Sequence, residues 1–379
     1  MIHLPMGFQA GGISAGIKAS GKPDLGIIVS TVPLAWAVTT TQNRAAAPCV
    51  IQARKLMQAG GDLKAIVVNS GNANCATKSA EADNLALAEA CANRLGVPAS
   101  EVLSASTGVI GMRLSVEKIK AASRQITLGE DLEAFAQAIL TTDTRIKVAS
   151  RKLGNAQVVG VAKGSGMIHP QMATLLAFIL TDAQIDQTEL RSNWPEVVAA
   201  TFNQVSVDGD TSTNDLAGIF ASGAAGAVNS EQFWQIVSEL ARDLAQQIAR
   251  DGEGASKLIQ VQVNQSASLT EARQAARAVV VSPLVKTALH GNDPNWGRML
   301  AALGNSGAAF VPEEVQILLQ GTLVYRGRAL DFDSDQLSRA LDSETVLIEV
   351  NLGAGSASAE AFGCDLSAEY VRINSLYTT

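Results

Sequence analysis

The sequence predicts an α/β fold with a substantial sheet. Short runs of aliphatic and β-branched residues, each bounded by turn residues, alternate along the chain with segments whose apolar residues recur every three or four positions. The 379 residues are 47% hydrophobic and only 17% charged, which suits a large core and is not typical of a disordered protein or a coiled coil. This length favours two domains or one large layered domain.

The predicted strands are short apolar or alternating runs that end at turn residues. In chain order they are residues 25–29, 65–68, 155–162, 175–180, 258–263 and 346–350. The first two are continuously apolar, as expected of strands buried on both faces, whereas 258–263 alternates and predicts a half-buried strand. A glycine-rich connection joins the third strand to the fourth.

Amphipathic periodicity predicts the helices, which are residues 79–94, 114–123, 132–140, 230–250 and 271–281. In the first of them Ser79 is placed to cap the N-terminus and Gly96 to end the helix, with Leu85, Ala88 and Ala92 on one face. The chain shows no internal repeat, no low-complexity tract and no long linker.

Charge and cysteine usage exclude several classes of partner. A formal net charge of −7 argues against a nucleic-acid backbone as the main partner. The four cysteines lack metal-site and Cys-x-x-Cys spacing, which predicts buried free thiols. The N-terminal segment lacks the pattern of a secretory signal, and no apolar run approaches the roughly 18 residues of a membrane span. We therefore expect a cytoplasmic protein with no membrane partner.

Several familiar site motifs are incomplete. Residues 16–22 have the glycine spacing of a phosphate-binding loop, but Pro23 stands where a Ser or Thr should hold Mg²⁺. Residues 208–214 resemble the start of a calcium loop, but its twelfth position is Ile219 rather than Glu. The three histidines are far apart in sequence, and Gly-x-Ser-x-Gly is absent from it. We therefore expect no metal and no organic cofactor.

The most unusual chemistry lies in residues 163–180, where Ala173 directly precedes Thr174 at the start of a predicted strand. A Thr hydroxyl is a weak nucleophile unless a base lies beside it. If the chain breaks between these two residues, Thr174 gains an α-amino group with a pKa of roughly 8, a few atoms from its hydroxyl. Cleavage would thus supply both nucleophile and base. The plainer alternative is that Thr174 is only a β-branched residue that begins a strand.

The segment KGSGMIHPQMATLLAFILTDA resembles the processing site of the ornithine acetyltransferase family, also called the glutamate N-acetyltransferases of arginine biosynthesis. Other blocks resemble the same family, in the same order, along nearly the whole chain. They are VVNSGNANCAT at 67–77, SASTGVIG at 104–111, LTTDT at 140–144, SVDGDTSTND at 206–215, DGEGASK at 251–257, HGNDPNWGR at 290–298 and YVRINSLYTT at 370–379.

This resemblance implies a protein that cleaves itself between Ala173 and Thr174 into an α chain (1–173) and a β chain (174–379). Thr174 would then be the nucleophile that accepts the acyl group. The resemblance also implies a four-layer α/β/β/α sandwich formed by both chains, as in the β-peptidyl aminopeptidases, with a smaller C-terminal α/β region at about 285–379. The implied assembly is a heterotetramer of two α and two β chains.

The resemblance further implies roles for polar residues around this centre. Thr107 and Gly108 match the pair that forms the oxyanion hole; from the residues alone, a helix cap followed by a turn glycine is the alternative. Lys163 matches a lysine that binds the amino-acid substrate, with a solvated loop lysine as the alternative. The asparagines of 69–74 could line the pocket, but we interpret them as turn formers.

Four more positions are implied to contact substrate. Thr142 matches a substrate-contacting threonine, with Thr141 as the one-residue alternative. Glu253 matches the acidic residue that holds a substrate ammonium group; a turn carboxylate is its alternative. Asn374 and Thr379 match residues that reach back to the pocket, which requires a docked C-terminal tail.

The implied reaction is a ping-pong transfer, in which acetyl passes from N2-acetyl-L-ornithine to Thr174 and then to L-glutamate, without a metal or cofactor. Some members of the family also use acetyl-CoA as donor, and the sequence does not say which kind this chain is. Two other classes stay open. One is an amidase or aminopeptidase of the same fold with water as acceptor, and the other is a non-catalytic processed heteromer used for binding.

Overall fold

The computed structural model describes residues 2–169 and 175–376, and it confirms the predicted α/β fold. The larger sheet has the strand order β4-β3-β2-β9-β7-β6-β5, with β1 paired to β2. Its strands are β1 (Phe8–Ile13), β2 (Leu25–Thr40), β3 (Leu63–Asn72), β4 (Val102–Val109), β5 (Lys147–Leu153), β6 (Ala156–Lys163), β7 (Leu176–Gln184) and β9 (Leu216–Ala227).

The long strand β2 joins two halves of this sheet. Its first part, from Leu25 to Val29, pairs with β3, and its last part, from Ala35 to Thr40, pairs with β9. The two halves face each other across one apolar core, because Ile66 and Val68 of β3 pack in the same cluster as Phe178 of β7. Successive side chains of a strand point to opposite faces, so each half has a second apolar face to cover.

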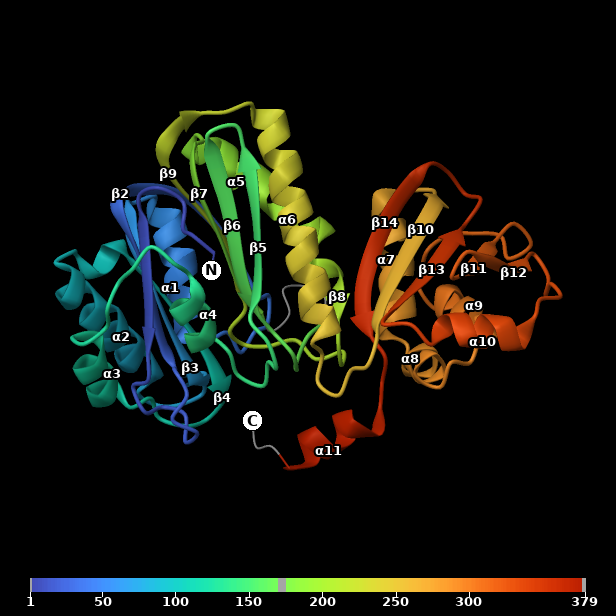
Figure 1. Cartoon of the computed structure of the whole chain (residues 1–379), viewed down its shortest axis with the longest axis horizontal. Helices are drawn as coiled ribbons and strands as arrows, with labels where there is room; N and C mark the ends of the chain where they lie inside the picture. Colours follow the sequence, from blue (N-terminus) through green and yellow to red (C-terminus); the bar gives the residue numbers. More distant parts are fainter. Residues whose placement is uncertain (1, 170–174, 377–379) are drawn as a thin grey trace.

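Helices cover these two outer faces and complete four layers, α/β/β/α (Figure 1). Ala65 and Val67 of β3 pack with buried residues of α2 and α3, whereas Ala177 and Ile179 of β7 pack with α5 and α6. The helices of this unit are α1 (Pro48–Ala59), α2 (Ala80–Leu95), α3 (Val116–Ser123), α4 (Glu133–Ala138), α5 (Gln187–Ala200) and α6 (Ser230–Arg250), with 3-10 turns at Ala99–Glu101 and Phe202–Gln204.

The smaller sheet lies beside this sandwich and has the order β12-β11-β13-β10-β14-β8 (Figure 1). The resemblance implies a smaller region at about 285–379, but two strands of this sheet, β8 and β10, precede residue 285 in the chain. The elements are β8 (Val205–Ser206), β10 (Leu258–Ser266), β11 (Gln316–Leu319), β12 (Thr322–Arg326), β13 (Thr345–Asn351) and β14 (Ala357–Cys364), with α7 (Leu269–Val281), α8 (Pro283–His290), α9 (Trp296–Gly304), α10 (Ser334–Leu341) and the C-terminal α11 (Ala368–Leu376).

The segment expected at 230–250 is confirmed as α6 with the same bounds. Asn229 caps it by accepting a hydrogen bond from Gln232 N at 2.9 Å, and its apolar stripe is buried against β5 and β6. The helix lies close to the sheet because Gly160 faces it: a β-carbon there would come within 2.6 Å of methyl carbons of both Leu240 and Leu244.

Helix α2 is confirmed with two corrections. Gly96 ends it in the left-handed conformation, at φ 69°, as expected. Ser79 does not cap it, because its hydroxyl donates instead to Asp83 Oδ2 at 2.7 Å. Leu85, which was expected on the apolar face, is 53% exposed, and Leu87 is buried in its place.

The four cysteines are free and buried, as predicted. Burial raises the pKa of Cys49 to about 11 and that of Cys91 to about 12, so neither thiol ionises near neutral pH. Within residues 2–169 and 175–376, no helix combines the length and the apolar character needed to cross a membrane.

Leu240→Ala should lower the free energy of unfolding of the sandwich by about 2–5 kcal/mol, because it leaves a cavity between α6 and β6. Urea titration followed by tryptophan fluorescence measures the change. The matched control is Leu85→Ala on the exposed side of α2, for which we expect a change within about 0.5 kcal/mol. Equal effects of the two substitutions would contradict the packing described here.

Candidate active site

A cavity of about 200 Å³ lies where β4 and β6 end and the turn after α6 approaches them. It brings together six residues that the resemblance implies: Thr107, Gly108, Thr142, Lys163, Glu253 and Asn374. The other lining residues are Ala73, Ile110, Thr141, Gly166, Met167, Asp208, Asp210, Ser212, Thr213, Asn214 and Tyr370. Ala173, Thr174 and Thr379 lie outside the described residues.

Thr107 and Gly108 are strand residues, so the helix-cap alternative is wrong. They pair in parallel with Ser70 and Gly71 of β3, next to a bulge at Asn72. Gly108 has φ +130°, and a β-carbon there would lie 2.4 Å from the carbonyl carbon of Gly71. Only glycine fits this position, and its backbone is open to close approach by a ligand.

Two of the asparagines expected in turns are strand residues, and one of them contacts the residue before Thr107. Asn69 lies in β3, and its Oδ1 accepts a hydrogen bond from Ser106 Oγ at 2.6 Å. Asn72 ends the same strand. Asn214 Nδ2 donates to Ser106 O at 2.9 Å from the other side. The residue before Thr107 is therefore held by both its side chain and its carbonyl oxygen.

Lys163, the last residue of β6, is only 2% exposed, so the solvated-loop alternative is wrong. Its Nζ donates to Thr107 Oγ1 at 3.1 Å. Burial lowers the pKa of Lys163, and Asp143 is the strongest of the charges that oppose this shift. In the sheet Lys163 pairs with Leu176, the first residue of β7.

Thr141 and Thr142 both line the cavity, but they have different surroundings. The amide and the hydroxyl of Thr141 donate to Asp143 Oδ2, at 2.9 and 3.4 Å. Thr141 is thereby tied to a neighbouring carboxylate.

Glu253 does lie in a turn, but it is buried to 9% exposure and its carboxylate faces the cavity. Asn374 Nδ2 donates to Glu253 Oε2 at 2.8 Å. The tail is docked as the resemblance requires: Ser367 Oγ donates to Gly254 O at 2.6 Å at the start of α11. Helix α11 therefore brings Asn374 to the cavity.

One residue of the block HGNDPNWGR, His290, helps to hold the turn after α6 in place. His290 Nδ1 lies 2.7 Å from Asp365 Oδ2, and Asp365 also accepts from Ser256 and from Lys257 N. Burial alone would raise the pKa of Asp365, but the bonds from Ser256 and His290 hold it below its usual range. These contacts join the turn after α6 to the chain just before α11.

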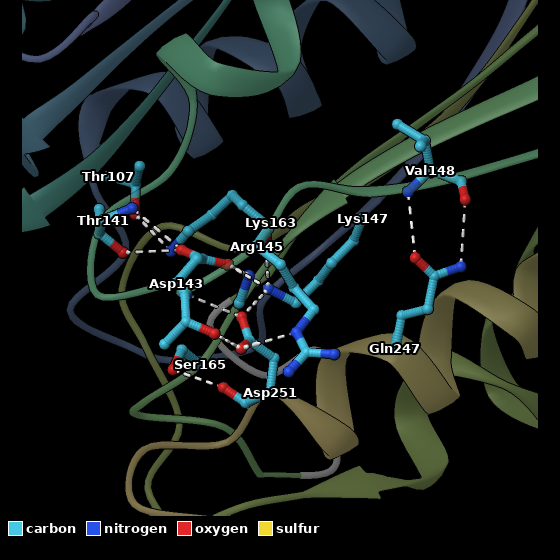
Figure 2. Close-up of polar contacts among 12 residues, drawn as sticks. Thr107, Thr141, Asp143, Arg145, Lys147, Val148, Lys163, Ser165, Gln247 and Asp251 are labelled. Carbon is cyan, nitrogen blue, oxygen red and sulfur yellow. Dashed lines mark hydrogen bonds and ion pairs between the residues drawn. The ribbon is translucent and has the colours of Figure 1, made fainter. Parts of the chain in front are cut away.

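Two buried ion pairs that share Lys147 lie next to Lys163 (Figure 2). Lys147 Nζ lies 2.7 Å from Asp143 Oδ1 and 2.5 Å from Asp251 Oδ2. Asp251 also accepts from the amide and the hydroxyl of Thr144. Its carbonyl oxygen accepts from Ser165 Oγ at 2.7 Å. Sequence reasoning missed this set, although Asp143 and Asp251 fall inside the blocks LTTDT and DGEGASK.

Asp208 holds the chain that leads toward residue 170. Its carboxylate accepts from the amides of Met167 and Ile168 at 2.6 and 2.8 Å. Burial raises the pKa of Asp208 to about 6. Sequence reasoning gave Asp208 no role beyond an incomplete calcium loop, although it falls inside the block SVDGDTSTND. Within the described ranges, no three His, Cys, Asp or Glu residues are grouped so that they could hold a metal ion.

The loop with phosphate-loop spacing is filled by the protein's own carboxylate. The amides of Ala15, Ile17 and Lys18 donate to Asp24 at 2.5, 2.6 and 2.9 Å. A ring of backbone N–H groups of this kind could bind an anion. Here Asp24 is that anion, which agrees with the expectation that no nucleotide binds at this loop.

Gly166→Ala should loosen α11 while leaving the fold in place. A β-carbon at Gly166 would lie 2.4 Å from the Glu253 carboxylate, which must then move and give up Asn374. Loss of the hydrogen bond from Asn374 to the charged Glu253 carboxylate should speed backbone amide hydrogen exchange in residues 368–376 by about tenfold or more. Gly61→Ala is the control, since nothing lies within 4 Å of a β-carbon there. Unchanged exchange in the Gly166 variant would contradict the docking of α11.

Comparison with known proteins agrees with the resemblance. The ArgJ family model matches residues 9–379. The arginine biosynthesis bifunctional protein ArgJ of Thermus thermophilus is 56% identical over 379 residues, which is 100% of each chain. The protein of the same name from Deinococcus radiodurans is 50% identical, covering 100% of this chain and 98% of the relative. A crystal structure of ArgJ from Bacillus halodurans has 40% identity and a TM-score of 0.51, and covers 53% of this chain and 98% of that one. The chain belongs to the ArgJ family.

Proposed function

We propose that the chain is a self-cleaving glutamate N-acetyltransferase of arginine biosynthesis, which transfers acetyl from N2-acetyl-L-ornithine to L-glutamate. One observation carries the proposal. Lys163 and Glu253 have opposite charges and line one small cavity together with Thr107 and Gly108. An amino-acid substrate with a carboxylate and an ammonium group needs such a pair of charges.

The proposed nucleophile is Thr174, freed by cleavage after Ala173. Its new α-amino group, for which the ordinary pKa is roughly 8, would take the proton from the hydroxyl as that oxygen attacks the acetyl carbonyl. Described residues on both sides of this segment support the location: Met167 lines the cavity, and Leu176 pairs with Lys163 in the sheet. Both processed chains would contribute to the site.

Thr107 and Gly108 are the proposed oxyanion hole. Attack on the acetyl carbonyl places negative charge on its oxygen, and preorganised N–H and O–H donors stabilise that charge. The Thr107 hydroxyl accepts a bond from Lys163 Nζ, so its own hydrogen is free to point at an oxyanion. The irregular pairing of β3 with β4 at Asn72 and the absent side chain at Gly108 would give the substrate access to the backbone.

The proposed substrate contacts follow from charge. Lys163 would bind the α-carboxylate, and Glu253 would bind the side-chain ammonium of acetylornithine. Thr142, Asn374 and Thr379 are the proposed hydrogen-bonding partners around it. After ornithine leaves, the amine of glutamate would attack the acetyl–Thr174 ester and form N-acetyl-L-glutamate.

Two further proposals concern the acetyl donor and the assembly of the chains. Because the proteins from Thermus and Deinococcus are named bifunctional, we propose a second reaction in which acetyl-CoA supplies the acetyl group to the same Thr174. We also propose that the α and β chains assemble as a heterotetramer of two copies of each. Neither proposal requires a metal or an organic cofactor.

Variants of Thr174 test this function. Thr174→Ala should leave the chain uncut and without transfer, because it lacks the hydroxyl for both steps. Thr174→Ser should cut and transfer, but about 10- to 100-fold more slowly, because the methyl group that restricts χ1 is lost. Intact-mass measurement would show fragments 1–173 and 174–379 in equal amounts in the wild type, and a coupled assay would follow N-acetylglutamate.

The assay is run with acetylornithine in the presence and absence of glutamate. Glutamate-dependent release of ornithine supports the transferase, whereas equal release without glutamate would favour the amidase or aminopeptidase alternative. A Thr174→Ala protein that transfers acetyl at the wild-type rate would contradict the proposal.

Truncating either pocket charge should weaken substrate binding. Lys163→Ala and Glu253→Ala should each cost roughly 1.5–3 kcal/mol in the apparent binding of acetylornithine, because each removes a charge-assisted hydrogen bond. Lys64→Ala is the matched control, since it removes an ion pair with Glu101 outside the cavity. Steady-state kinetics give the KM values, and an unchanged KM for both substrates would remove that residue from the site.

A further inference from the structure

Of the buried charged residues beside the cavity, Asp143, Lys147 and Asp251 have no part in the proposed chemistry. Lys147 is paired with Asp143 and with Asp251, and these three residues together with the neighbouring Lys163 are what we call the charge cluster; their side chains converge in Figure 2. The side chains of Lys147 and Asp143 are fully buried, and that of Asp251 is 2% exposed. Two cations and two carboxylates leave the cluster neutral. Buried charges are costly even when paired, so the placement of this cluster beside a binding site calls for a functional reason.

Asp143 connects both walls of the cavity. Its Oδ1 accepts hydrogen bonds from Gly164 N and from Lys147 Nζ, both at 2.7 Å. Its Oδ2 accepts from Thr141 N at 2.9 Å. Gly164 follows Lys163 directly, and Thr141 lines the cavity. One carboxylate therefore fixes the end of β6 relative to the 141–144 loop.

Asp143 is also the anion best able to keep Lys163 protonated. Burial alone would raise the pKa of Asp143, but Lys163 and Lys147 outweigh it and hold that pKa well below the usual range. Asp143 is thus ionised at every working pH. For Lys163 the direction is the reverse: burial lowers its pKa, and Asp143 opposes that shift more than any other charge does.

Other charges face Lys163 from the elements packed around it. They are Lys18 from the loop after β1, Lys147 from β5, Asp215 just before β9 and Glu253 from the turn after α6. The two lysines lower the pKa of Lys163, and the two acids raise it. Burial raises the pKa of Asp215 well above its ordinary value, which favours its neutral form. Glu253 is the proposed partner of the substrate ammonium, which leaves Asp143 as the steady counter-ion.

We propose that Asp143 is a positioning residue, which holds the Lys163 ammonium charged and in place to take up the α-carboxylate of the amino-acid substrate. This rests on the proposed function. An ammonium carries three N–H donors, and the bond to Thr107 uses one of them. Asp143 balances Lys163 from behind, while the substrate carboxylate approaches from the cavity.

Lys147 and Asp251 support Asp143 from the far side. Lys147 shares its ammonium between the two carboxylates, which keeps them from repelling each other. Asp251 follows α6, beyond the proposed cleavage bond, whereas Asp143 and Lys147 precede it. The cluster therefore joins the two proposed chains at the substrate site.

The test compares Asp143→Asn with Asp243→Asn, a matched control that removes a partly exposed carboxylate paired with Arg151. Kinetics with acetylornithine are measured from about pH 6 to about pH 10, the range that spans the amine and lysine titrations. For Asp143→Asn we expect KM to rise about 10- to 100-fold with a smaller change in kcat. The alkaline fall of kcat/KM should move to lower pH, because Lys163 loses its proton earlier. Asp243→Asn should match the wild type in both respects.

A substrate analogue without the carboxylate separates positioning from general damage. N-acetylputrescine lacks the group that Lys163 would bind, so its kcat/KM should be nearly the same in the wild type and in Asp143→Asn. An equal loss for both substrates would show a merely structural role and overturn the inference. If Asp143→Asn does not fold, Asp143→Glu takes its place in the test. This variant keeps the negative charge, so the alkaline fall of kcat/KM should stay at the wild-type pH. A shift of that fall to lower pH would also overturn the inference.

Calorimetric binding of L-ornithine separates this inference from the proposed function, because it needs no acetyl transfer. The affinity of Asp143→Asn should fall about 10- to 100-fold, and more steeply at high pH than in the wild type. Protein that binds ornithine but transfers no acetyl would contradict the proposed function alone. An unchanged affinity in Asp143→Asn at every pH would overturn the inference, whether or not transfer occurs.

Discussion

The constraint on which the site depends is a lysine that must be buried and still charged. Lys163 ends a central strand, where the sheet fixes its backbone and the surrounding core lowers its pKa. A flexible surface lysine would bind a carboxylate weakly, because water screens the pair. Burial strengthens that interaction but disfavours the charge. Asp143 opposes the second effect, and Lys147 and Asp251 hold Asp143 in place in turn.

The same constraint explains why the site draws on both parts of the chain. The cations and the proposed oxyanion-hole pair come from β4, β5 and β6, whereas Glu253, Asp251 and Asn374 come from segments far along the chain. The sandwich brings the first set together, and the turn after α6 and the docked α11 bring the second. Cleavage between the two parts would leave them joined by the shared core between the sheets and by the buried ion pairs.

Much of the fold could be predicted from the sequence, because helices such as 230–250 carry a full apolar stripe and strands such as 65–68 are continuously apolar. Several elements were not predicted, among them β1, β5, β14, α1 and α5. Strand β9 is another, since LAGIFASGAAGA is rich in small residues and has little β-propensity. The cap at Ser79 was wrong because a nearby carboxylate competes for the hydroxyl. For the site, the resemblance located Lys163 and Glu253, but no local pattern could reveal the pairing of Lys147 with Asp251, which lie 104 positions apart.

The central claim is that Thr174 carries the acetyl group between the two substrates. The most direct measurement is to incubate the protein with N2-acetyl-L-ornithine alone, to quench in acid so that acetyl cannot migrate to the α-amino group, and to map the peptides by mass spectrometry. The account predicts one acetyl group on the hydroxyl of Thr174, in the peptide that begins at that residue, and its loss when glutamate is added before the quench. An unmodified Thr174 in protein that is turning over, or an acetyl group on another residue, would contradict it.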